Sequence, residues 1–568
     1  MPASFGKLAI VLLTLTLLCQ ACLALEIEGQ GILQSVKAEV VIEGSGEISG
    51  NLQGVDVEIE ILSFKENQNQ KVLSLEESLE INGKNVLAEE KEDEFGNRYA
   101  LFKVGETGSF SYRIEAVVET GMTLPDLQEY DLETEIGDFP EFLEASENIE
   151  SNDEAIRTLA MNRFGKSSWI ETLAETTQWT YESIDYDLSY FPETWKATEV
   201  LKEKKGVCDE FSVLSASILR ARGIPTRVVT GITYNPKEGQ GWNNHAWLES
   251  WNPGFGWVSS DPTFGEAGIV GGTHIARGLF KDPKNATITR ARAVKGTNVR
   301  VEERLPKVEI VSTREFSGIF SLFGEDAVLP ANEWHTLIVE AENKLDKTVI
   351  GIFTLVLPSD FTPQSKKTMQ VFEPGEKRAL IWDMMVDREL EKNQQLTGKY
   401  KVYAIGSEIE KKLKVMPGES FSEEAKIRLV DLIPIVEENT LVFEATVENV
   451  GAKKAMVEIS ANGLSEEFEV KGYEQAAARL EIPALEGNAY TVTVKGPGLD
   501  HSSSITVHEG TAMPVSGDDD IFGDDLPTIE ELFHSATGNF FSIEAGLIAG
   551  LLIGVAVIVL LLKELLSR

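Results

Sequence analysis

Three side chains between residues 200 and 265 have the types needed for acyl transfer. Cys208 stands where a helix is expected to begin, and His245 and Asp261 lie in strand-like stretches. The start of a helix favours thiolate over thiol, and the thiolate is the nucleophile. Asp209 and Glu210 oppose this by like charge, so the sequence leaves the balance open. An imidazole can take a proton from a thiol, and a carboxylate can orient the imidazole. These residue types predict a thiol nucleophile with a histidine base.

The spacing of His245 and Asp261 favours this arrangement. If a hairpin is centred near Gly254, Trp247 faces Asp261 and His245 faces Thr263. Both site residues then lie on one face of the hairpin, diagonally placed. Each residue also has a plainer interpretation, because a lone cysteine is commonly buried and structural, and a lone histidine is commonly a surface or core residue. Their occurrence together and in this order favours the site.

Other residues of the same region are weaker candidates. Trp242 and Trp247 are predicted to line a substrate cleft, with core packing as the plainer alternative. His274 is an alternative base, but it follows a loop-like stretch without an acid nearby, so it receives little weight. Asn285 opens an Asn-Ala-Thr glycosylation motif, which can also arise by chance. The spacing of His, Asp and Glu supports no catalytic metal, and no cofactor is predicted.

The elements that must position these residues are helices followed by strands. Ser151 with Glu154, and Ser168 with Glu171, form two capping boxes that would open helices. Further helices are expected over 196–204 and 207–222, and strands over 227–233, 246–251 and 256–260. The pattern predicts an α+β domain over 141–300.

Four motifs in this domain resemble the transglutaminase-like core. They are Gly206–Asp209, Leu219–Gly231, Asn244–Trp247 and Gly256–Thr263, and the resemblance covers roughly residues 150–265. It implies a papain-like fold with Cys208 as nucleophile, His245 as general base and acid, and Asp261 as the residue that orients the histidine. The family's oxyanion donor precedes the cysteine by some tens of residues. Gln178 or Trp179 would fill that role beside the backbone N–H of Cys208.

The regions around this domain alternate in polarity every second residue. An N-terminal β-domain is expected over 25–140, and two immunoglobulin-like β-sandwiches over 305–415 and 420–509. The segments 336–343 and 440–449 resemble each other weakly, at about the spacing of one sandwich domain. The sandwiches are read as docking or adhesion modules or, with more weight, as spacers, because no special residues cluster in them. The predicted fold class is multidomain α+β, with a papain-like transglutaminase core flanked by these β-domains and followed by a C-terminal transmembrane helix.

The two ends of the sequence predict an extracytoplasmic location. Residues 1–24 resemble a secretory signal, with an uncleaved anchor as the alternative. Residues 510–543 form an acidic stalk, 545–562 are long enough to span a bilayer, and 563–568 form a basic cytoplasmic tail. The glycines Gly546, Gly550 and Gly554 recur every four residues and could let two such helices pair, although they are more simply ordinary membrane glycines.

Composition narrows the function further. The formal net charge is −40, which should repel nucleic acid and excludes it as a partner. Three cysteines are present, and two of them lie in the predicted signal segment. The mature chain would therefore hold one thiol and no internal disulfide.

The sequence predicts a membrane-anchored thiol enzyme that attacks protein or peptide amides through a thioester, with hydrolysis favoured. One alternative is a transglutaminase that cross-links protein glutamines, since an amine can accept the acyl group as water does. A second is an inactive adhesion or scaffold protein, which the intact set of three residues disfavours. Regulation by calcium on so acidic a surface stays open.

Overall fold

The computed structural model describes residues 32–514, apart from 133–138, 165–167, 191–193, 236–240, 284–287, 387, 392–393, 419–421, 423, 438–439, 486 and 509–510. The chain divides into two compact units, Met1–Ser422 and Glu423–Arg568. The predicted signal segment, membrane helix, cytoplasmic tail and nearly all of the stalk lie outside the described residues, as do Asn285 and the three glycines Gly546, Gly550 and Gly554. Within the described part of the chain, no helix is both long and apolar enough to cross a membrane.

The first unit begins with an antiparallel β-domain, as expected. Its strands are β1 (Leu33–Gly50), β2 (Val57–Leu62), β3 (Gln70–Ile81), β4 (Lys84–Leu87), β5 (Glu89–Glu92), β6 (Arg98–Val104) and β7 (Gly108–Thr120). Alternate residues of β1 are buried, so this strand presents one face to a core that includes Val40 and Ile42. This period-two burial is the pattern that the sequence shows.

Three later strands return to this β-domain, which the sequence did not reveal. They are β15 (Thr289–Arg292), β16 (Thr297–Glu303) and β17 (Lys307–Glu315). β15 pairs with β2, while β16 and β17 both pair with β1. The expected sandwich at 305–415 therefore starts too early, because β17 belongs to the N-terminal sheet. Local alternation marks a strand but does not say which distant strand it pairs with.

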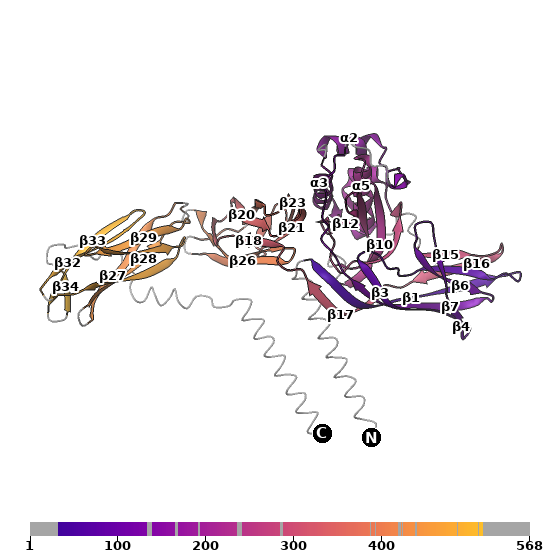
Figure 1. Cartoon of the computed structure of the whole chain (residues 1–568), viewed down its shortest axis with the longest axis horizontal. Coiled ribbons are helices and arrows are strands. Elements are labelled where there is room, and N and C mark those ends of the chain that lie inside the picture. Colours follow the sequence, from indigo (N-terminus) through magenta and orange to yellow (C-terminus); the bar gives the residue numbers. More distant parts are fainter. Residues whose placement is uncertain are drawn as a thin grey trace, which may run out of the picture. The chain divides into compact units, whose positions relative to one another are not determined.

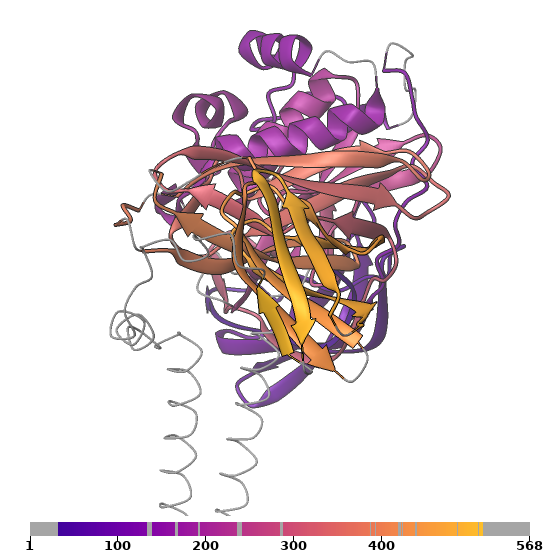
Figure 2. The same cartoon turned by 90° about the vertical axis from the view of Figure 1, so that its left-hand side faces the viewer.

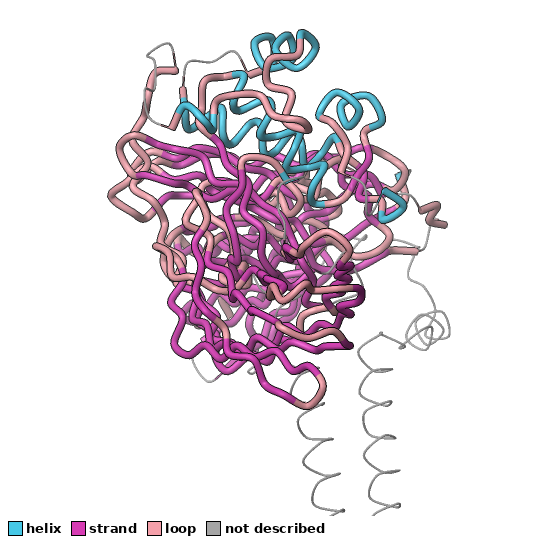
Figure 3. The backbone as a smooth tube through the Cα atoms, turned by 90° about the vertical axis from the view of Figure 1, so that its right-hand side faces the viewer, coloured by secondary structure: helices cyan, strands magenta, loops and turns pink. Residues whose placement is uncertain are grey.

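The middle of the unit is the expected α+β domain. Its helices are α2 (Glu154–Arg163), α3 (Trp169–Ser183), α4 (Ala197–Glu203) and α5 (Cys208–Ala221), with short 3₁₀ turns η1 (Pro140–Phe142) and η2 (Leu188–Tyr190). Its strands are β10 (Thr226–Asn235), β11 (Gly241–Asn252), β12 (Gly256–Asp261), β13 (Glu266–Ala267) and β14 (Ile275–Phe280), in the order β13-β12-β11-β10-β14. A two-residue pair, β8 (Asp185–Tyr186) and β9 (Lys205–Gly206), stands apart. The helices lie over β10 and β12 in Figure 1, and the turned views of Figures 2 and 3 show them gathered on one side of the strands.

Helix starts follow side-chain capping. Ser168 caps α3 by accepting a hydrogen bond from the backbone N–H of Glu171, as the sequence predicts. The start of α2 differs, because Asp153 rather than Ser151 accepts from the N–H groups of Ala155 and Ile156. An ionised Asp suits an N-cap as well as Ser does, and it lies directly before the first helical residue.

A two-sheet β-sandwich completes the first unit. Its strands are β18 (Phe320–Phe323), β19 (Ala327–Pro330), β20 (Trp334–Asn343), β21 (Val349–Val356), β22 (Phe361–Pro363), β23 (Lys367–Phe372), β24 (Lys377–Val386), β25 (Leu396–Ala404) and β26 (Ser407–Met416). The sheet orders are β18-β20-β24-β22 and β19-β26-β25-β21-β23. We call this the first sandwich. Its core is continuous with that of the α+β domain, since one cluster of buried residues includes both Trp169 and Phe353.

The second unit is another two-sheet sandwich, which we call the second sandwich. Its strands are β27 (Ile427–Glu437), β28 (Thr440–Asn449), β29 (Ala455–Ala461), β30 (Leu464–Val470), β31 (Gln475–Pro483), β32 (Ala489–Gly496), β33 (Leu499–His508) and β34 (Thr511–Pro514). The sheet orders are β27-β28-β31 and β30-β29-β32-β33-β34. Its buried cluster, which includes Phe443 and Val492, draws only on its own described strands and the short segments between them.

Candidate active site

The nucleophile candidate is the first residue of α5. Cys208 is half-buried, and the residue before it, Val207, is in an extended conformation. Glu210 fixes this end of the helix: one carboxylate oxygen accepts from the N–H of Val207 at 2.8 Å, and the other accepts from the N–H of Trp195 at 3.0 Å. The segment before the cysteine is thereby tied to the first turn of its helix.

The next turn of α5 is bound to the strand that carries His245. Ser212 Oγ donates to the carbonyl oxygen of Ala246, at 3.3 Å. Cys208 lies four residues before Ser212, on the same face of the helix, and His245 directly precedes Ala246. The carboxyl of Asp209, next to the cysteine, is also close enough to His245 to interact with it electrostatically. The fold therefore places the first turn of α5 beside His245.

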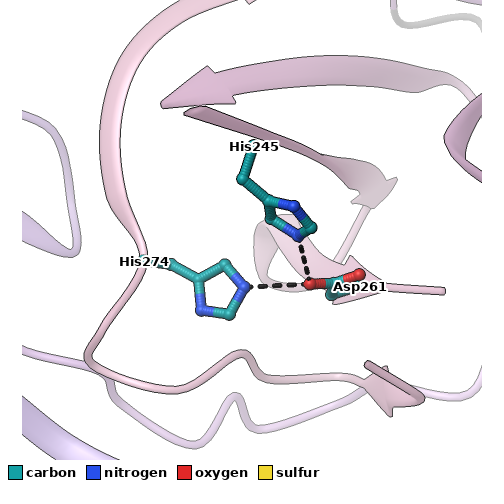
Figure 4. Close-up of side chains that lie close together, drawn as sticks. All are labelled: His245, Asp261 and His274. Carbon is teal, nitrogen blue, oxygen red and sulfur yellow. Dashed lines mark hydrogen bonds and ion pairs between the residues drawn. The ribbon is translucent and has the colours of Figure 1, made fainter. Parts of the chain in front are cut away.

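The hairpin of β11 and β12 has the register that the sequence predicts. Trp251 pairs with Trp257 and Leu248 with Ser260, which centres the turn on Gly254. In this register Nε2 of His245 lies 2.7 Å from Oδ2 of Asp261 (Figure 4). Both side chains are fully buried.

The other ring nitrogen of His245 points away from the acid. No described residue forms a hydrogen bond with this buried Nδ1. The ring of Phe264 stacks on the imidazole at a centroid distance of 4.8 Å and an interplanar angle of 15°. The imidazole is thus held from one side by an aromatic ring and at Nε2 by the carboxylate, which leaves Nδ1 for proton transfer.

Asp261 also binds a second histidine, which the sequence does not predict. The expectation that His274 lacks an acid partner is wrong, because its Nε2 lies 3.0 Å from the same oxygen, Oδ2 of Asp261. Figure 4 shows both imidazoles directed at that oxygen, His245 from strand β11 and His274 from the turn that precedes β14. The partner lies 13 residues earlier in the chain, across turns that carry no periodic pattern. Only the fold reveals the contact.

Charge in the site follows from these bonds. Burial alone would raise the pKa of Asp261, but the charges of and hydrogen bonds from His245 and His274 outweigh it and hold that pKa well below its usual range. Burial alone would lower the pKa of His274, but its hydrogen bond to Asp261 and the charges of Glu266 and Asp261 raise it. Asp261 is therefore a carboxylate at neutral pH.

The acids beside the cysteine are less charged than their sequence suggests. Burial raises the pKa of Glu210 to about 7, and burial also raises the pKa of Asp209. Near neutral pH, Asp209 and Glu210 therefore repel a thiolate at Cys208 less strongly than two fully ionised acids would.

The structure also brings together three potential metal ligands. Single donor atoms of His245, Asp261 and His274 lie within 4.8 Å of one another, a grouping that the sequence spacing did not predict. The Nε2 atoms of His245 and His274 lie 2.7 and 3.0 Å from Oδ2 of Asp261, which are ordinary hydrogen-bond distances. A zinc ion bound at about 2.0–2.1 Å from each nitrogen would have to displace the protons of these hydrogen bonds. We therefore treat the group as a hydrogen-bonded set.

The two predicted oxyanion donors lie on α3 and have other partners. Gln178 donates from its side chain to the carbonyl oxygen of Lys367 at 2.9 Å, and also to Glu182. The ring of Trp179 has the Nζ of Lys204 4.3 Å from its centroid. Their oxyanion role stays a prediction.

The two predicted cleft residues lie in different environments. Trp242 is partly buried, packs against the N-terminal β-domain and contacts Tyr234 edge-on. Trp247 is only 3% exposed and packs edge-on against His274, with ring centroids 5.0 Å apart. Core packing therefore accounts for Trp247, while a cleft role for Trp242 stays a prediction.

Comparisons with known proteins find a known family domain in this part of the chain. Residues 159–262 match the family model of the transglutaminase-like superfamily. The chain is 31% identical over 134 residues to the uncharacterized protein YebA of Bacillus subtilis, covering 20% of this chain and 18% of that one. It is 38% identical over 68 residues to a protein-glutamine gamma-glutamyltransferase of Pseudomonas aeruginosa, covering 11% and 10%. The chain thus spans less than a fifth of the length of these curated relatives.

Two solved structures are similar at low identity. One, from Cytophaga hutchinsonii, is described as a candidate cysteine protease, with 21% identity, a TM-score of 0.38, and coverage of 50% of this chain and 93% of that one. The other is the periplasmic domain of TgpA from Pseudomonas aeruginosa bound to ethylmercury, with 20% identity, a TM-score of 0.22, and coverage of 40% and 91%. Residues 159–262 therefore form a transglutaminase-like domain within this chain.

Proposed function

We propose that this protein is a thiol hydrolase that cleaves protein or peptide amides, with Cys208 as nucleophile, His245 as general base and acid, and Asp261 as the orienting acid. One observation carries the proposal: His245 binds Asp261 through Nε2 at 2.7 Å and directs a buried, unpartnered Nδ1 away from it, beside the first turn of the helix that Cys208 begins. This is the division of roles that an activated thiol requires.

The reaction follows from these positions. His245 Nδ1 takes the thiol proton, and the sulfur attacks the amide carbonyl carbon to form a C–S bond. The backbone N–H of Cys208, at the positive end of α5, is the oxyanion donor that we propose. The C–N bond then breaks, the proton passes from His245 to the leaving amine, and a thioester remains. Water, deprotonated by His245, attacks the thioester and releases a carboxylic acid and the thiol.

Water is the proposed acceptor because it needs no binding site of its own. The second candidate function is glutamine cross-linking, in which a lysine amine attacks the thioester. The local similarity to a protein-glutamine gamma-glutamyltransferase favours that candidate. The same residues serve both reactions, so the acceptor must be decided by product analysis.

The deciding experiment incubates the full chain with a panel of glutamine-containing peptides in the presence of a fluorescent primary amine. Hydrolysis gives a free carboxyl at the attacked position and a shortened or deamidated peptide by mass spectrometry. Transamidation gives the amine adduct instead. The variant Cys208→Ala is the control and should form neither product. Equal product from Cys208→Ala would overturn the thiol mechanism, whereas no product from the wild-type chain would favour the scaffold alternative.

The proposed location is the outer face of a cell membrane. The predicted signal over 1–24 and the predicted helix over 545–562 support it. The partners proposed are a protein or peptide substrate, the membrane, and a second copy through Gly546, Gly550 and Gly554. Labelling of intact cells with a membrane-impermeant thiol reagent tests the location, because only an external Cys208 would react without lysis.

A further inference from the structure

The carboxylate of Asp261 accepts four hydrogen bonds. Oδ1 accepts from the backbone N–H groups of Thr263 at 2.7 Å and Phe264 at 3.1 Å. Oδ2 lies 2.7 Å from His245 Nε2 and 3.0 Å from His274 Nε2. Every polar direction of this buried carboxylate is therefore used. The backbone bonds fix one oxygen, and the two histidines share the other.

Both ring nitrogens of His274 face groups that can only accept. Nε2 faces the Asp261 carboxylate, and Nδ1 lies 3.0 Å from the carbonyl oxygen of Gly271. A carbonyl oxygen and an ionised carboxylate have no proton to donate, so each hydrogen bond requires an N–H on the ring. An imidazole with two N–H groups is an imidazolium. The arrangement around His274 is thus complete only when that ring is positively charged.

The surroundings of His274 support a buried cation. Glu266 of β13 accepts from the N–H of Gly271 at 2.9 Å, so an acid also holds the loop that binds Nδ1. The groups that act on the ring are Asp261 and His245 on the hairpin, Glu266 on β13 and the indole of Trp247. Lys367, in the first sandwich, is close enough to Glu266 and Asp261 to interact with their charges. Its Nζ donates to the carbonyl oxygen of Phe264 at 2.6 Å.

We propose that His274 is a permanently charged positioning residue, which keeps Asp261 ionised and holds its Oδ2 in place for His245. The inference rests on the proposed function for its catalytic consequence, but the charged state of His274 can be measured independently of catalysis. During the reaction the proton from Cys208 passes through His245 alone, and His274 neither gains nor loses one. His274 would thus orient the carboxylate of Asp261, just as that carboxylate orients the imidazole of His245.

The first test is the protonation state itself. The full chain contains six histidines, so selective ¹⁵N labelling of histidine gives a simple spectrum. We expect one ring with two protonated nitrogens at neutral pH, and its signals should vanish in His274→Gln. A His274 ring with a single N–H at neutral pH would overturn the proposal, whatever the activity of the protein.

The second test is kinetic. His274→Gln keeps a side-chain amide that can donate to Asp261 but removes the charge. We expect it to slow alkylation of Cys208 by roughly 10- to 100-fold and to change the shape of its pH dependence. His274→Arg, which restores a cation with several donors, should recover part of the rate. Wild-type rate and pH dependence in His274→Gln would overturn the inference.

A matched control separates this effect from the loss of any histidine. His335, in the first sandwich, is half-buried and also binds a backbone carbonyl, that of Pro330, at 3.1 Å. His335→Gln should leave both the rate and its pH dependence unchanged. If His274→Gln does not fold, the spectrum of the wild-type chain still decides the proposal. If Cys208 in the wild type reacts independently of His245, the proposed function fails, while the charge on His274 stands or falls by the spectrum.

Discussion

The two β-sandwiches look alike along the chain but differ in what they are joined to. Each contains a strand that ends in a fully buried asparagine, Asn343 in β20 and Asn449 in β28. Each asparagine donates to the carbonyl oxygen four residues later, Lys347 at 2.9 Å and Lys453 at 2.7 Å. The weak resemblance between the segments 336–343 and 440–449 therefore corresponds to a repeated structural feature.

The first sandwich is built into the α+β domain that carries the candidate site. Nζ of Lys367 donates to the carbonyl oxygen of Phe264 at 2.6 Å, and the ring of Phe264 stacks on His245. Lys347 donates to the carbonyl oxygen of Leu124, also at 2.6 Å. These contacts and the continuous hydrophobic core show that the first sandwich packs directly against the domain that carries His245. The comparison shows that a module which resembles a spacer in sequence can share the core of the domain that carries the candidate site.

The largest expected effect comes from removing each sandwich in turn. A chain ending at Glu315 should lose cooperative folding, because Phe353, Val349 and other core residues of the shared cluster disappear. A chain ending at Ser422 should keep both its thermal transition and its Cys208 reactivity. Circular dichroism on heating and thiol labelling measure both. Wild-type labelling by the shorter chain would show that the first sandwich is dispensable.

The two asparagines provide a matched pair of point variants. Asn343→Ala and Asn449→Ala each remove a buried side chain with several backbone hydrogen bonds, so each should cost about 2–4 kcal/mol in the free energy of unfolding. Denaturant unfolding measures this cost. Only Asn343→Ala should lower the denaturant concentration at which Cys208 labelling changes. An equal loss of labelling in both variants would contradict the division of the chain into two compact units.

Lys367 tests the contact behind the site more locally. Lys367→Met keeps the aliphatic stem but leaves the Phe264 carbonyl without its side-chain donor, which should cost about 1–3 kcal/mol and slow Cys208 labelling. Lys495→Met is the control, because Lys495 is more than half exposed and its Nζ lies 3.9 Å from an oxygen of Asp500. Its cost should be within about 0.5 kcal/mol. Identical behaviour of the two variants would remove Lys367 from the site.

The smallest effect is a pH dependence that belongs to the first unit. The pKa of Glu210 is raised by burial from 4.5 to about 7, so between these values the folded state binds more protons at this group than the unfolded state. The contribution of Glu210 to stability therefore falls as pH rises through this window. Glu210→Gln should flatten the curve of unfolding free energy against pH. Parallel curves for the variant and the wild type would contradict the assignment.

Much of the site could be predicted from local sequence. The helix start at Cys208 and the hairpin turn at Gly254 are set by neighbouring residues, so the helix and the register of His245 with Asp261 could be inferred. The second histidine could not, because its contact with Asp261 depends on how the turns after β12 bring His274 back. Local patterns encode elements, whereas contacts between distant elements depend on the whole core.

The same limit explains the errors in domain organisation. β16 and β17 pair with β1 more than 240 residues earlier, for example Val301 with Gly46, and alternation within each strand cannot specify that partner. The docking of the first sandwich could not be predicted for a related reason. In sequence, Ile350 resembles any core residue of a sandwich, and only the fold packs the loop at Gly268 against it. The cap of α2 shifted from Ser151 to Asp153 because both residue types suit an N-cap.

The most direct test of the central claim is the rate at which an amide-mimicking thiol probe labels Cys208 across pH in the full chain, compared with His245→Ala and Asp261→Asn. We predict rapid labelling of the wild type near neutral pH, with a large loss in His245→Ala and a smaller one in Asp261→Asn. Slow labelling that ignores both substitutions, and that rises only near the ordinary thiol pKa of about 8.5, would contradict an activated nucleophile at this site.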